Sequence, residues 1–463
     1  MAPGRPERPE DPVDEVLPST LARAPGLAAS FVRATIECPH PFALPTRLGP
    51  ADPFVPQAGW SDSHEGGVRW LALGTLDAIE APAGSGPAAA LAAIDRARER
   101  LKVLASLTPD PSLVRYVGGI AFDPRDRARD DWPEGVAARF VLPKILLREE
   151  NGIADVVVMG APEGEARELL ARIEAAAAMP CGAPAPIPMR RLADPAARER
   201  WTNAVLAVLA AIDSGAVRKV VLSRDIALEA DEPIDAWELL RLVDRRDPHG
   251  LRFCLRFSGE AAFVGATPER LVSQRGAQVA CDCLAGTSVR GVTPQEEARN
   301  AAALLASEKD GREHRIVLEE ILEALAPHVR ALDSPPTPRI LALAEVQHLW
   351  SPIRARLREG TGIGPVVAAL HPTAAVGGSP RERALDLIRD LEGRPRGWYA
   401  GLVGWIGTDA SDFAVAIRSG IVRGRRMTAF GGAGIVRGSD PAAEWDETAR
   451  KAASFIHLFA ERA

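Results

Sequence analysis

The alternation of hydrophobic and polar residues predicts a chain with many short strands and fewer helices. Apolar runs with a period of two are typical of strands, whereas apolar residues three and four apart are typical of amphipathic helices. Strands are predicted at 68–73, 116–122, 140–147, 219–224, 253–257, 261–264, 270–272, 278–284, 398–406 and 413–417, and another ends at 347–349. Helices are predicted at 88–107, 198–214, 237–243 and 295–325, and from 380 and 441 onward. Because few strands are followed by a crossover helix, we expect antiparallel sheets with helices outside them, a mixed α/β fold of the α+β type.

Proline-rich segments divide the chain. Residues 1–14 are rich in proline and charge and lack the apolar core of a signal peptide, so we expect a disordered tail. A second proline-rich segment at 177–189 is the best boundary candidate. We therefore predict an N-terminal part of the α/β fold at 15–190 and a catalytic region at 191–463. No apolar run approaches the roughly 18 residues of a membrane span, so we expect a cytoplasmic protein that has no membrane partner.

Charge and cysteine content exclude two classes of protein. The formal net charge of -6 over 463 residues argues against nucleic acid as a partner, because phosphate binding needs a basic surface. The 5 cysteines are odd in number and scattered, so they form no disulfide framework. Cys281 and Cys283 alternate on one predicted strand and lack the second pair of ligands that a zinc site needs, so we expect buried structural thiols.

The last fifty or so residues concentrate polar chemistry. The predicted strand 413–417 ends at Arg418, and a second apolar run leads into the glycine-rich segment 431–434. Asp440 and Pro441 are favoured residues at the N-cap and first position of a helix. On that helix one face carries three charged residues, namely Glu444, Glu447 and Lys451. A cation, a glycine-rich backbone and two carboxylates suit a small anionic ligand that is held partly through a metal.

Short motifs from 195 to 460, in this order, resemble those of the chorismate-utilising enzymes. They are KVVLSR at 219, GATPERL at 265, LAGT at 284, SEKDGREH at 307, QHL at 347, HPTAAVGG at 371, GLVGW at 401, AIRSG at 416, and GGAGIV at 431 with EWDET at 444. The family includes isochorismate, salicylate, anthranilate and aminodeoxychorismate synthases. The N-terminal part resembles the family in general layout alone. The resemblance implies two stacked, largely antiparallel sheets surrounded by helices, with the active site in a cleft.

Two features within these motifs indicate the branch of the family. Lys219 stands where the water-using synthases have a lysine and the ammonia-using synthases usually have glutamine. The segment HPTAAVGG at 371 is similar to the isochorismate synthase form. The resemblance therefore implies an isomerase that converts chorismate to isochorismate with Mg²⁺, by water attack at C2 and loss of the C4 hydroxyl. It also implies a monomer without a glutaminase partner, in menaquinone or siderophore biosynthesis.

Alternative functions remain open at this stage. A salicylate synthase would carry out the same isomerisation and then eliminate pyruvate. A non-catalytic chorismate-binding paralogue could keep the same fold. The presence of four residues argues against the paralogue, since binding alone needs no acid and base on opposite faces of a ring: Lys219, Glu269, Glu313 and Glu447.

The resemblance assigns the two proton transfers to Lys219 and Glu269. Lys219 would act as the base on water, which requires a pKa below the ordinary value of about 10.4. Glu269 would protonate the leaving hydroxyl, which requires a raised pKa. Outside this family pattern, a lysine at the start of a strand and a glutamate in a turn are usually solvated.

The remaining site residues are assigned by the same resemblance. Glu313 and Glu447 match the magnesium ligands, and Glu444 lies near the metal or binds it through water. Groups expected to bind or enclose the substrate are Gly286, Thr287, His348, Ala375, Arg418, Gly432 and Lys451. Arg418 suits the enolpyruvyl carboxylate because a guanidinium can donate two parallel hydrogen bonds.

Overall fold

The computed structural model describes residues 31–459, except 63–66, 107, 109, 128–131, 133–134, 247–249, 257–260 and 344–345. The predicted tail at 1–14 lies outside the described residues. Within them, no helix is long and apolar enough to cross a membrane.

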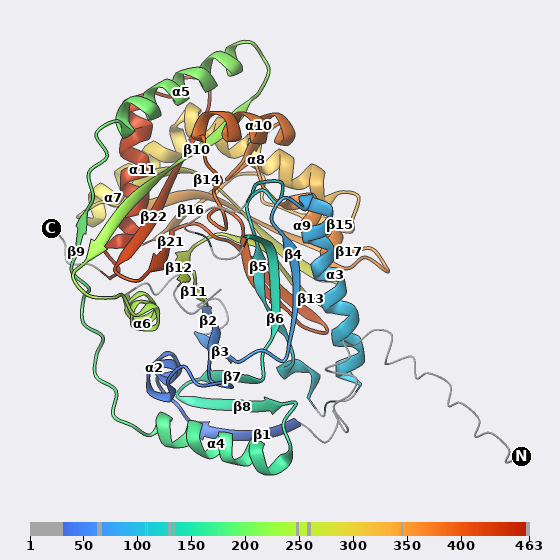
Figure 1. Ribbon diagram of the computed structural model, residues 1–463. Helices are drawn as coiled ribbons and strands as arrows, with labels where there is room; N and C mark the ends of the chain where they lie inside the picture. Colours follow the sequence, from blue (N-terminus) through green and yellow to red (C-terminus); the bar gives the residue numbers. More distant parts are fainter. Residues whose placement is uncertain are drawn as a thin grey trace, which may run out of the picture.

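The first sheet has twelve described strands, and every pairing in it is antiparallel (Figure 1). In spatial order the strands are β1 (Phe31–Glu37), β8 (Ile153–Met159), β7 (Ile145–Glu150), β3 (Val68–Leu73), β2 (Pro56–Asp62), β11 (Leu251–Arg256), β12 (Ala261–Thr267), β21 (Ser419–Arg423), β22 (Arg426–Ile435), β10 (Lys219–Ala230) and β18 (Gly378–Ser379). Strand β9 (Met189–Arg191) also pairs with β10.

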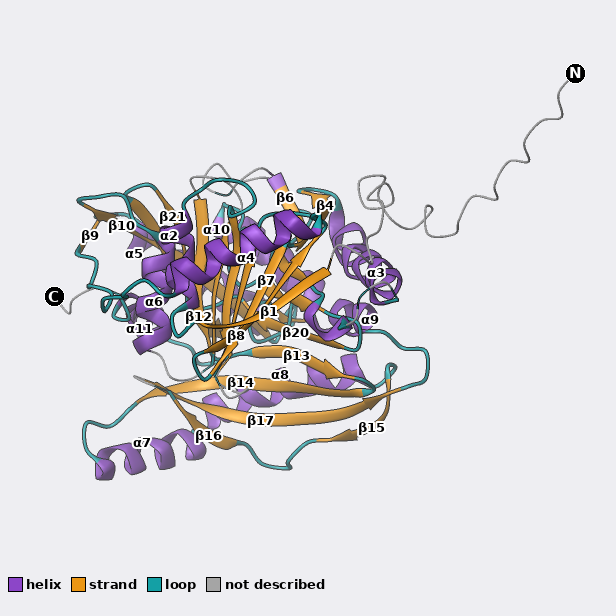
Figure 2. Ribbon diagram, turned by 90° about the horizontal axis from the view of Figure 1, so that it is seen from below, coloured by secondary structure: helices purple, strands orange, loops and turns teal. Residues whose placement is uncertain are grey.

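The second sheet has ten described strands and is also antiparallel. Its order is β15 (Val329–Asp333), β17 (Val346–Leu357), β14 (Gln278–Val289), β13 (Arg270–Arg275), β20 (Ala410–Val415), β19 (Leu402–Ile406), β5 (Tyr116–Ile120), β6 (Val136–Leu142) and β4 (Asp77–Pro82), and β16 (Arg339–Ala342) pairs with β17. Figure 2 shows β14 and β17 lying below the strands of the first sheet. One large apolar core contains residues of both sheets.

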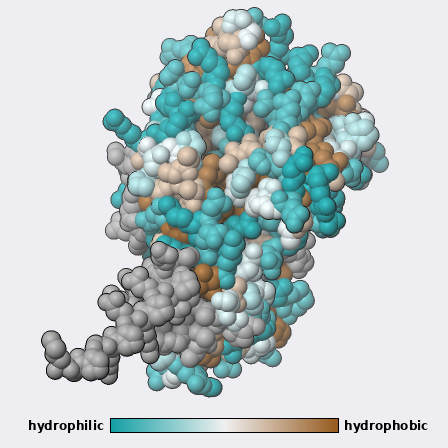
Figure 3. Space-filling view, turned by 90° about the vertical axis from the view of Figure 1, so that its right-hand side faces the viewer, coloured by the Kyte–Doolittle hydropathy of each residue, from teal (hydrophilic) through white to brown (hydrophobic). Residues whose placement is uncertain are grey.

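Helices surround the two sheets. They are α2 (Leu44–Leu48), α3 (Gly86–Ala105), α4 (Glu163–Ala177), α5 (Ala197–Asp213), α6 (Ala236–Arg246), α7 (Pro294–Ala306), α8 (Glu308–Leu325), α9 (Ile363–Leu370), α10 (Arg381–Glu392) and α11 (Pro441–Ile456), with short 3₁₀ turns η2 (Pro41–Ala43) and η4 (Pro111–Leu113). Four of them, α5, α8, α10 and α11, gather at the top of Figure 1. The right-hand face of that view is mostly hydrophilic with small hydrophobic areas (Figure 3). The predicted antiparallel α+β architecture is confirmed.

The proline-rich connector at 177–189 joins two parts of the same sheets. Strand β2, before the connector, pairs with β11, which follows it. In the second sheet β5 pairs with β19 in the same way. Both layers are therefore built jointly by the N-terminal part and the catalytic region.

The single helix predicted at 295–325 is wrong, because the structure has two helices there. The chain becomes extended at Ser307, whose φ is -70° and ψ is 116°. Its side chain then accepts a hydrogen bond from the backbone N–H of Asp310 at 3.2 Å and caps α8. Serine is among the residues most favoured at the N-cap of a helix. The break starts a new helix, α8, and Glu313 lies in this second helix.

Of the smaller predictions, that of one strand is wrong and that of the buried thiols is confirmed. The strand predicted at 140–147 is divided between β6 and β7, which belong to different sheets. The glycine-rich segment 431–434 lies within strand β22 and pairs with β10. Cys281 and Cys283 are buried free thiols on β14, as predicted.

Candidate active site

One cavity collects most of the predicted site residues. It encloses about 660 Å³ of empty space, including solvent at its mouth. Nine predicted residues line it, namely Glu269, Gly286, Thr287, Glu313, His348, Ala375, Arg418, Gly432 and Lys451. They come from both sheets and from α8 and α11. The structure thus brings together groups that are separated by almost two hundred positions in the sequence.

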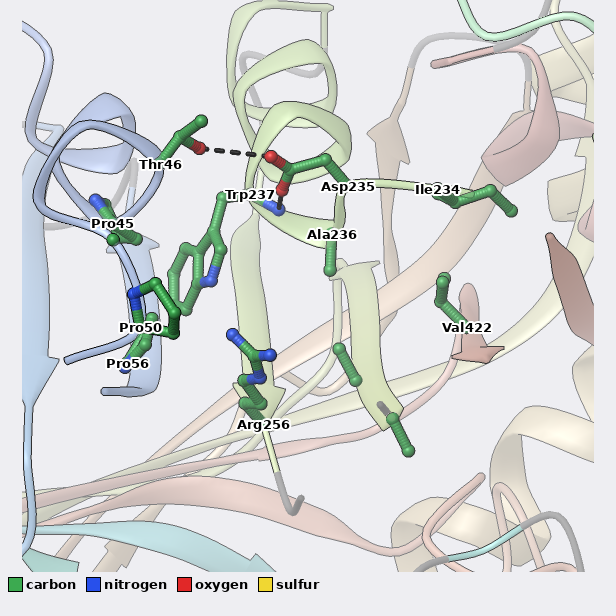
Figure 4. A pocket seen from close by; sticks show the side chains of 13 residues that line it. Pro45, Thr46, Pro50, Pro56, Ile234, Asp235, Ala236, Trp237, Arg256 and Val422 are labelled. Carbon is green, nitrogen blue, oxygen red and sulfur yellow. Dashed lines mark hydrogen bonds between the residues drawn. The ribbon is translucent and has the colours of Figure 1, made fainter. Parts of the chain in front are cut away.

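A larger cavity lies elsewhere and lacks this chemistry. It encloses about 820 Å³ beside α2 and the start of α6, where Trp237, Arg256 and several prolines line it (Figure 4). In this view Thr46 contacts Asp235, which caps α6. No predicted catalytic or metal-binding residue lines this cavity. The smaller cavity is therefore the candidate active site, because the predicted polar and charged residues line it and do not line the larger one.

Lys219 and Glu313 form an ion pair between β10 and α8. Lys219 begins β10 and exposes 0% of its side chain, whereas Glu313 on α8 exposes 13%. Their nitrogen and oxygen atoms are 2.9 Å apart. No well-aligned acceptor among the described residues receives a hydrogen bond from the Lys219 ammonium. Burial opposes ionisation of Glu313, but Lys219 and Lys451 outweigh it and hold its pKa below the usual value.

Gly434 leaves the space in which this ion pair fits. A Cβ atom at position 434 would lie 2.2 Å from Glu313 Oε1 and 2.9 Å from Lys219 Cε. Neither contact is possible without displacing one of the two side chains. The glycine near the end of β22 is therefore required by the charged pair beside it, despite its cost to strand stability.

The substitution Gly434→Ala should consequently separate Lys219 from Glu313 and lower kcat by roughly 100-fold, because displacements of about 1 Å in an active site have effects of that size. Steady-state kinetics would measure this loss. Gly164→Ala on α4 is the matched control, since a Cβ there has no neighbour within 4 Å. Full activity of Gly434→Ala would contradict the requirement for glycine.

Glu269 lies between β12 and β13 as a buried carboxyl group. It exposes 5% of its surface. Burial raises the pKa of Glu269 to about 8, although Lys219 draws it downward. Its backbone is fixed because its N–H donates to Thr267 Oγ1 at 3.2 Å and its carbonyl accepts from the Val415 N–H at 3.0 Å. Glu269 is thus protonated at neutral pH and can donate a proton into the cavity.

Arg418, His348 and Thr287 form a continuous polar chain along one wall. Arg418 Nη2 contacts His348 Nε2 at 3.3 Å, and His348 Nδ1 contacts Thr287 Oγ1 at 3.0 Å. Burial, Arg418 and Lys451 lower the pKa of His348 well below its usual value. Because arginine can only donate, the neutral imidazole carries its proton on Nδ1. Arg418 has a φ of +49°, a strained conformation of the kind that clusters at functional sites.

Gly286 sits at a break in the register of β14. The pairing with β17 shifts between Ala285 and Thr287, and Gly286 has a φ of +79°. His314 supports this bulge because its ring nitrogens contact the Ala285 carbonyl at 3.3 Å and Ser351 Oγ at 2.9 Å. The bulge brings the backbone of Gly286 to the cavity wall.

Tyr399 is a cavity residue that the sequence analysis missed. Its ring stacks on Phe430 with centroids 4.7 Å apart. Its hydroxyl oxygen lies 2.9 Å from the position of a Cβ at Gly432. Burial raises the pKa of the Tyr399 hydroxyl to about 12, so it stays a hydrogen-bond donor. The sequence feature that could have indicated its place in the cavity is the polar hydroxyl of a tyrosine within an apolar segment.

The two remaining predicted metal ligands are paired with lysines. Glu444 contacts Lys309 at 2.6 Å, and Glu447 contacts Lys451 at 2.7 Å. Glu444 exposes 1% of its surface, and its Oε2 atom has no hydrogen-bond partner among the described residues. Burial and the neighbouring Glu447 raise the pKa of Glu444. The contact between Lys309 and Glu444 shows that α8 and α11 face each other here.

The donor set suits a hard divalent cation. Glu313, Glu444 and Glu447 offer carboxylate oxygens alone, which Mg²⁺ prefers. The unpartnered Oε2 of Glu444 is an available ligand atom. Among the described residues no group of three such side chains is already arranged around one point. The lysine contacts account for this, since each carboxylate is held by an ammonium group.

Comparison with known proteins identifies similar chains. Residues 51–460 match the family model described as chorismate binding enzyme. A Pseudomonas aeruginosa protein named salicylate biosynthesis isochorismate synthase is 35% identical over 453 residues, which cover 94% of this chain and 92% of the relative. The isochorismate synthase MenF of Bacillus subtilis is 35% identical over 339 residues, covering 72% and 71% of the two chains.

A solved structure has the same architecture. It is MenF, the menaquinone-specific isochorismate synthase from Escherichia coli, with a TM-score of 0.75 and 27% identity. The superposition covers 93% of this chain and 95% of that chain.

Proposed function

Because the chain belongs to the chorismate-binding enzyme family, we propose that it is an isochorismate synthase, an isomerase that converts chorismate to isochorismate. One observation carries this proposal beyond family membership. The buried carboxyl group of Glu269 lines the cavity, and the fully buried Lys219 contacts Glu313, which also lines it, at 2.9 Å. An isomerisation in which water attacks one ring carbon and a protonated hydroxyl leaves another as water needs one base and one acid.

Two side chains carry the proposed proton transfers, one as base and one as acid. Lys219 must be in its neutral amine form when it takes a proton from the water that attacks C2, and the ammonium group that this transfer forms is the one that pairs with Glu313 at 2.9 Å. Glu269 gives its proton to the C4 hydroxyl, which leaves as water. With a pKa of about 8, Glu269 is protonated at neutral pH and can donate this proton as the C4–O bond breaks.

Cationic and polar groups orient the two carboxylates of the substrate. Arg418, held in its strained conformation, suits the enolpyruvyl carboxylate. Lys451, Thr287 and the backbone of Gly432 line the same cavity and suit the ring carboxylate or its metal. The neutral His348 fixes the spacing between Arg418 and Thr287 without adding charge.

Mg²⁺ would be held by Glu313 and Glu447, with Glu444 bound directly or through water. When bound, the ion supplies positive charge that fixes the ring carboxylate and withdraws electrons from the ring. Water as nucleophile also removes any need for ammonia, so we propose that the enzyme acts without a glutaminase subunit. We expect this chemistry in the cytoplasm.

The substitution Glu447→Gln should weaken Mg²⁺ binding at least ~10-fold, because a ligand carboxylate is lost. Isothermal titration calorimetry of the protein with MgCl₂ measures this without turnover. Glu199→Gln, at an exposed position on α5, is the control and should bind as the wild type does. Equal affinities in all three proteins would contradict the assignment of Glu447 as a ligand.

Incubation with chorismate and Mg²⁺, followed by chromatography, tests the function. We expect isochorismate in equilibrium with remaining chorismate, and loss of conversion when EDTA is added. Salicylate together with pyruvate would instead show a salicylate synthase. Absence of any product, even with ammonia supplied, would favour a chorismate-binding paralogue without catalysis.

A further inference from the structure

Arg396 is among the largest side chains that are fully buried in the described structure. It exposes 1% of its surface, and its guanidinium stacks on Phe122 at 4.2 Å. Burying a guanidinium is costly unless its N–H groups are paired. Here Glu392 compensates the charge, with contacts of 3.0 Å to Nε and 2.6 Å to Nη2. The remaining donors are directed at the protein backbone.

The two backbone partners of Arg396 belong to two segments that line the cavity. Nη2 donates to the Val221 carbonyl on β10 at 2.7 Å, and Nη1 donates to the Val376 carbonyl at 2.8 Å. Both valines line the candidate active site. Val221 follows Lys219 by two positions, and Val376 follows Ala375 directly. The guanidinium is rigid and planar, so it reinforces the spacing between the strand that carries the base and the segment that shapes the pocket. The two segments also contact each other directly, because the Val221 N–H donates to the Gly377 carbonyl at 2.8 Å.

Glu392 fastens the same strand at a second point. Its Oε1 accepts a hydrogen bond from the Ser223 backbone N–H at 2.7 Å, and its Oε2 accepts one from Ser223 Oγ at 3.0 Å. Between Val220 and Leu228 this edge of β10 has no strand neighbour among the described residues, since β18 ends at Val220 and β9 begins at Leu228. The ion pair occupies this gap and satisfies backbone groups that a strand would otherwise pair.

We propose that Arg396, through Glu392, is a positioning residue that holds Lys219 and Val221 at a set distance from the 375–376 wall. The inference rests on the proposed function, because it concerns the placement of the general base. The groups that bind carboxylates, Arg418 and Lys451, lie on other elements. Loss of the guanidinium should thus disturb proton transfer more than substrate binding.

The substitution Arg396→Lys keeps the charge but cannot reach both carbonyls and the carboxylate in one plane. We expect kcat to fall about 10- to 100-fold, with KM for chorismate changed less than about threefold. Hydrogen exchange should increase at the amides of Val221 and Ser223. The matched control is Arg252→Lys, because Arg252 is also buried and paired with Asp244 but lies away from the cavity. It should lose comparable thermal stability while keeping its kcat.

Three outcomes would overturn the inference: unchanged kcat in Arg396→Lys, a rise in KM alone, or an equal loss of kcat in Arg252→Lys. If Arg396→Lys does not fold, Ser223→Ala replaces it and removes one contact of Glu392. This variant should show faster exchange at position 223 and a kcat lowered roughly two- to fivefold, and an unchanged kcat would contradict the proposal. Wild-type turnover is measured alongside; its absence would contradict the proposed function itself rather than the role of Arg396.

Discussion

Replacing Lys219 by glutamine is expected to lower kcat for chorismate by about 10³- to 10⁴-fold, the upper range for loss of a general base. Glutamine has the length to enter the same space, but it cannot accept a proton from water. It also leaves Glu313 without its partner at 2.9 Å. Chorismate should still bind because Arg418 and Lys451 remain in place, and Mg²⁺ should still bind because its proposed carboxylate ligands remain. The measurement is kcat from initial rates together with calorimetric binding of chorismate in the presence of Mg²⁺.

A matched control shows whether the loss of any lysine charge, rather than of the proposed base, lowers activity. Lys102→Gln removes a lysine whose side chain is 64% exposed and which pairs with Glu99 on α3. Surface ion pairs of this kind contribute little to stability, so activity and melting temperature should stay near the wild-type values. If the Lys219→Gln variant retained turnover, the assignment of Lys219 as the general base would be contradicted.

The substitution Glu269→Gln should lower kcat by about 10²- to 10⁴-fold, because the amide occupies the same volume and cannot deliver a proton. The wild type should show an additional signature in its pH profile. Its acid is protonated below a pKa of about 8 and ionised above it. Activity should therefore be present below pH 8 and fall as the pH rises through that value. The residual activity of the glutamine variant should lack this alkaline limb, and a wild type that keeps full activity at pH 10 would contradict the role of Glu269.

Stability offers a second test of the same carboxyl group. Its pKa is about 4.3 in an unfolded chain and about 8 in the folded protein. The folded state thus binds the proton more tightly, so the stability that protonated Glu269 contributes is complete below pH 4.3 and is lost as the pH rises through 8. Relative to Glu269→Gln, the melting temperature of the wild type should fall between pH 5 and pH 9. A difference that does not change with pH would indicate a solvated Glu269.

The fold was largely predictable because strand patterns are local. Alternating runs such as the one that became β20 carry their own signal, and β10 and β14 were recognised over part of their length. The break between α7 and α8 was missed because apolar periodicity continues across it. The signal that could have found it was Ser307 followed three positions later by Asp310, a helix-start pattern.

The sequence predicted nine residues that line one cavity, but it did not predict their electrostatics. The segment Thr267-Pro268-Glu269 is typical of an exposed turn, and its burial depends on packing between two sheets. The pairing of Lys219 with Glu313 joins positions that are far apart in the chain. Likewise, Gly434 is needed for its lack of a side chain beside that pair, which no local pattern reveals.

Conversion of chorismate in H₂¹⁸O with Mg²⁺, followed by mass spectrometry of the product, tests the central claim most directly. If Lys219 activates water for attack at C2 while the C4 hydroxyl leaves, isochorismate must gain one solvent oxygen and its mass must rise by about two units, as general-base activation of solvent water requires. Unlabelled isochorismate would mean that the hydroxyl migrates within the substrate, and it would contradict the proposed roles of Lys219 and Glu269.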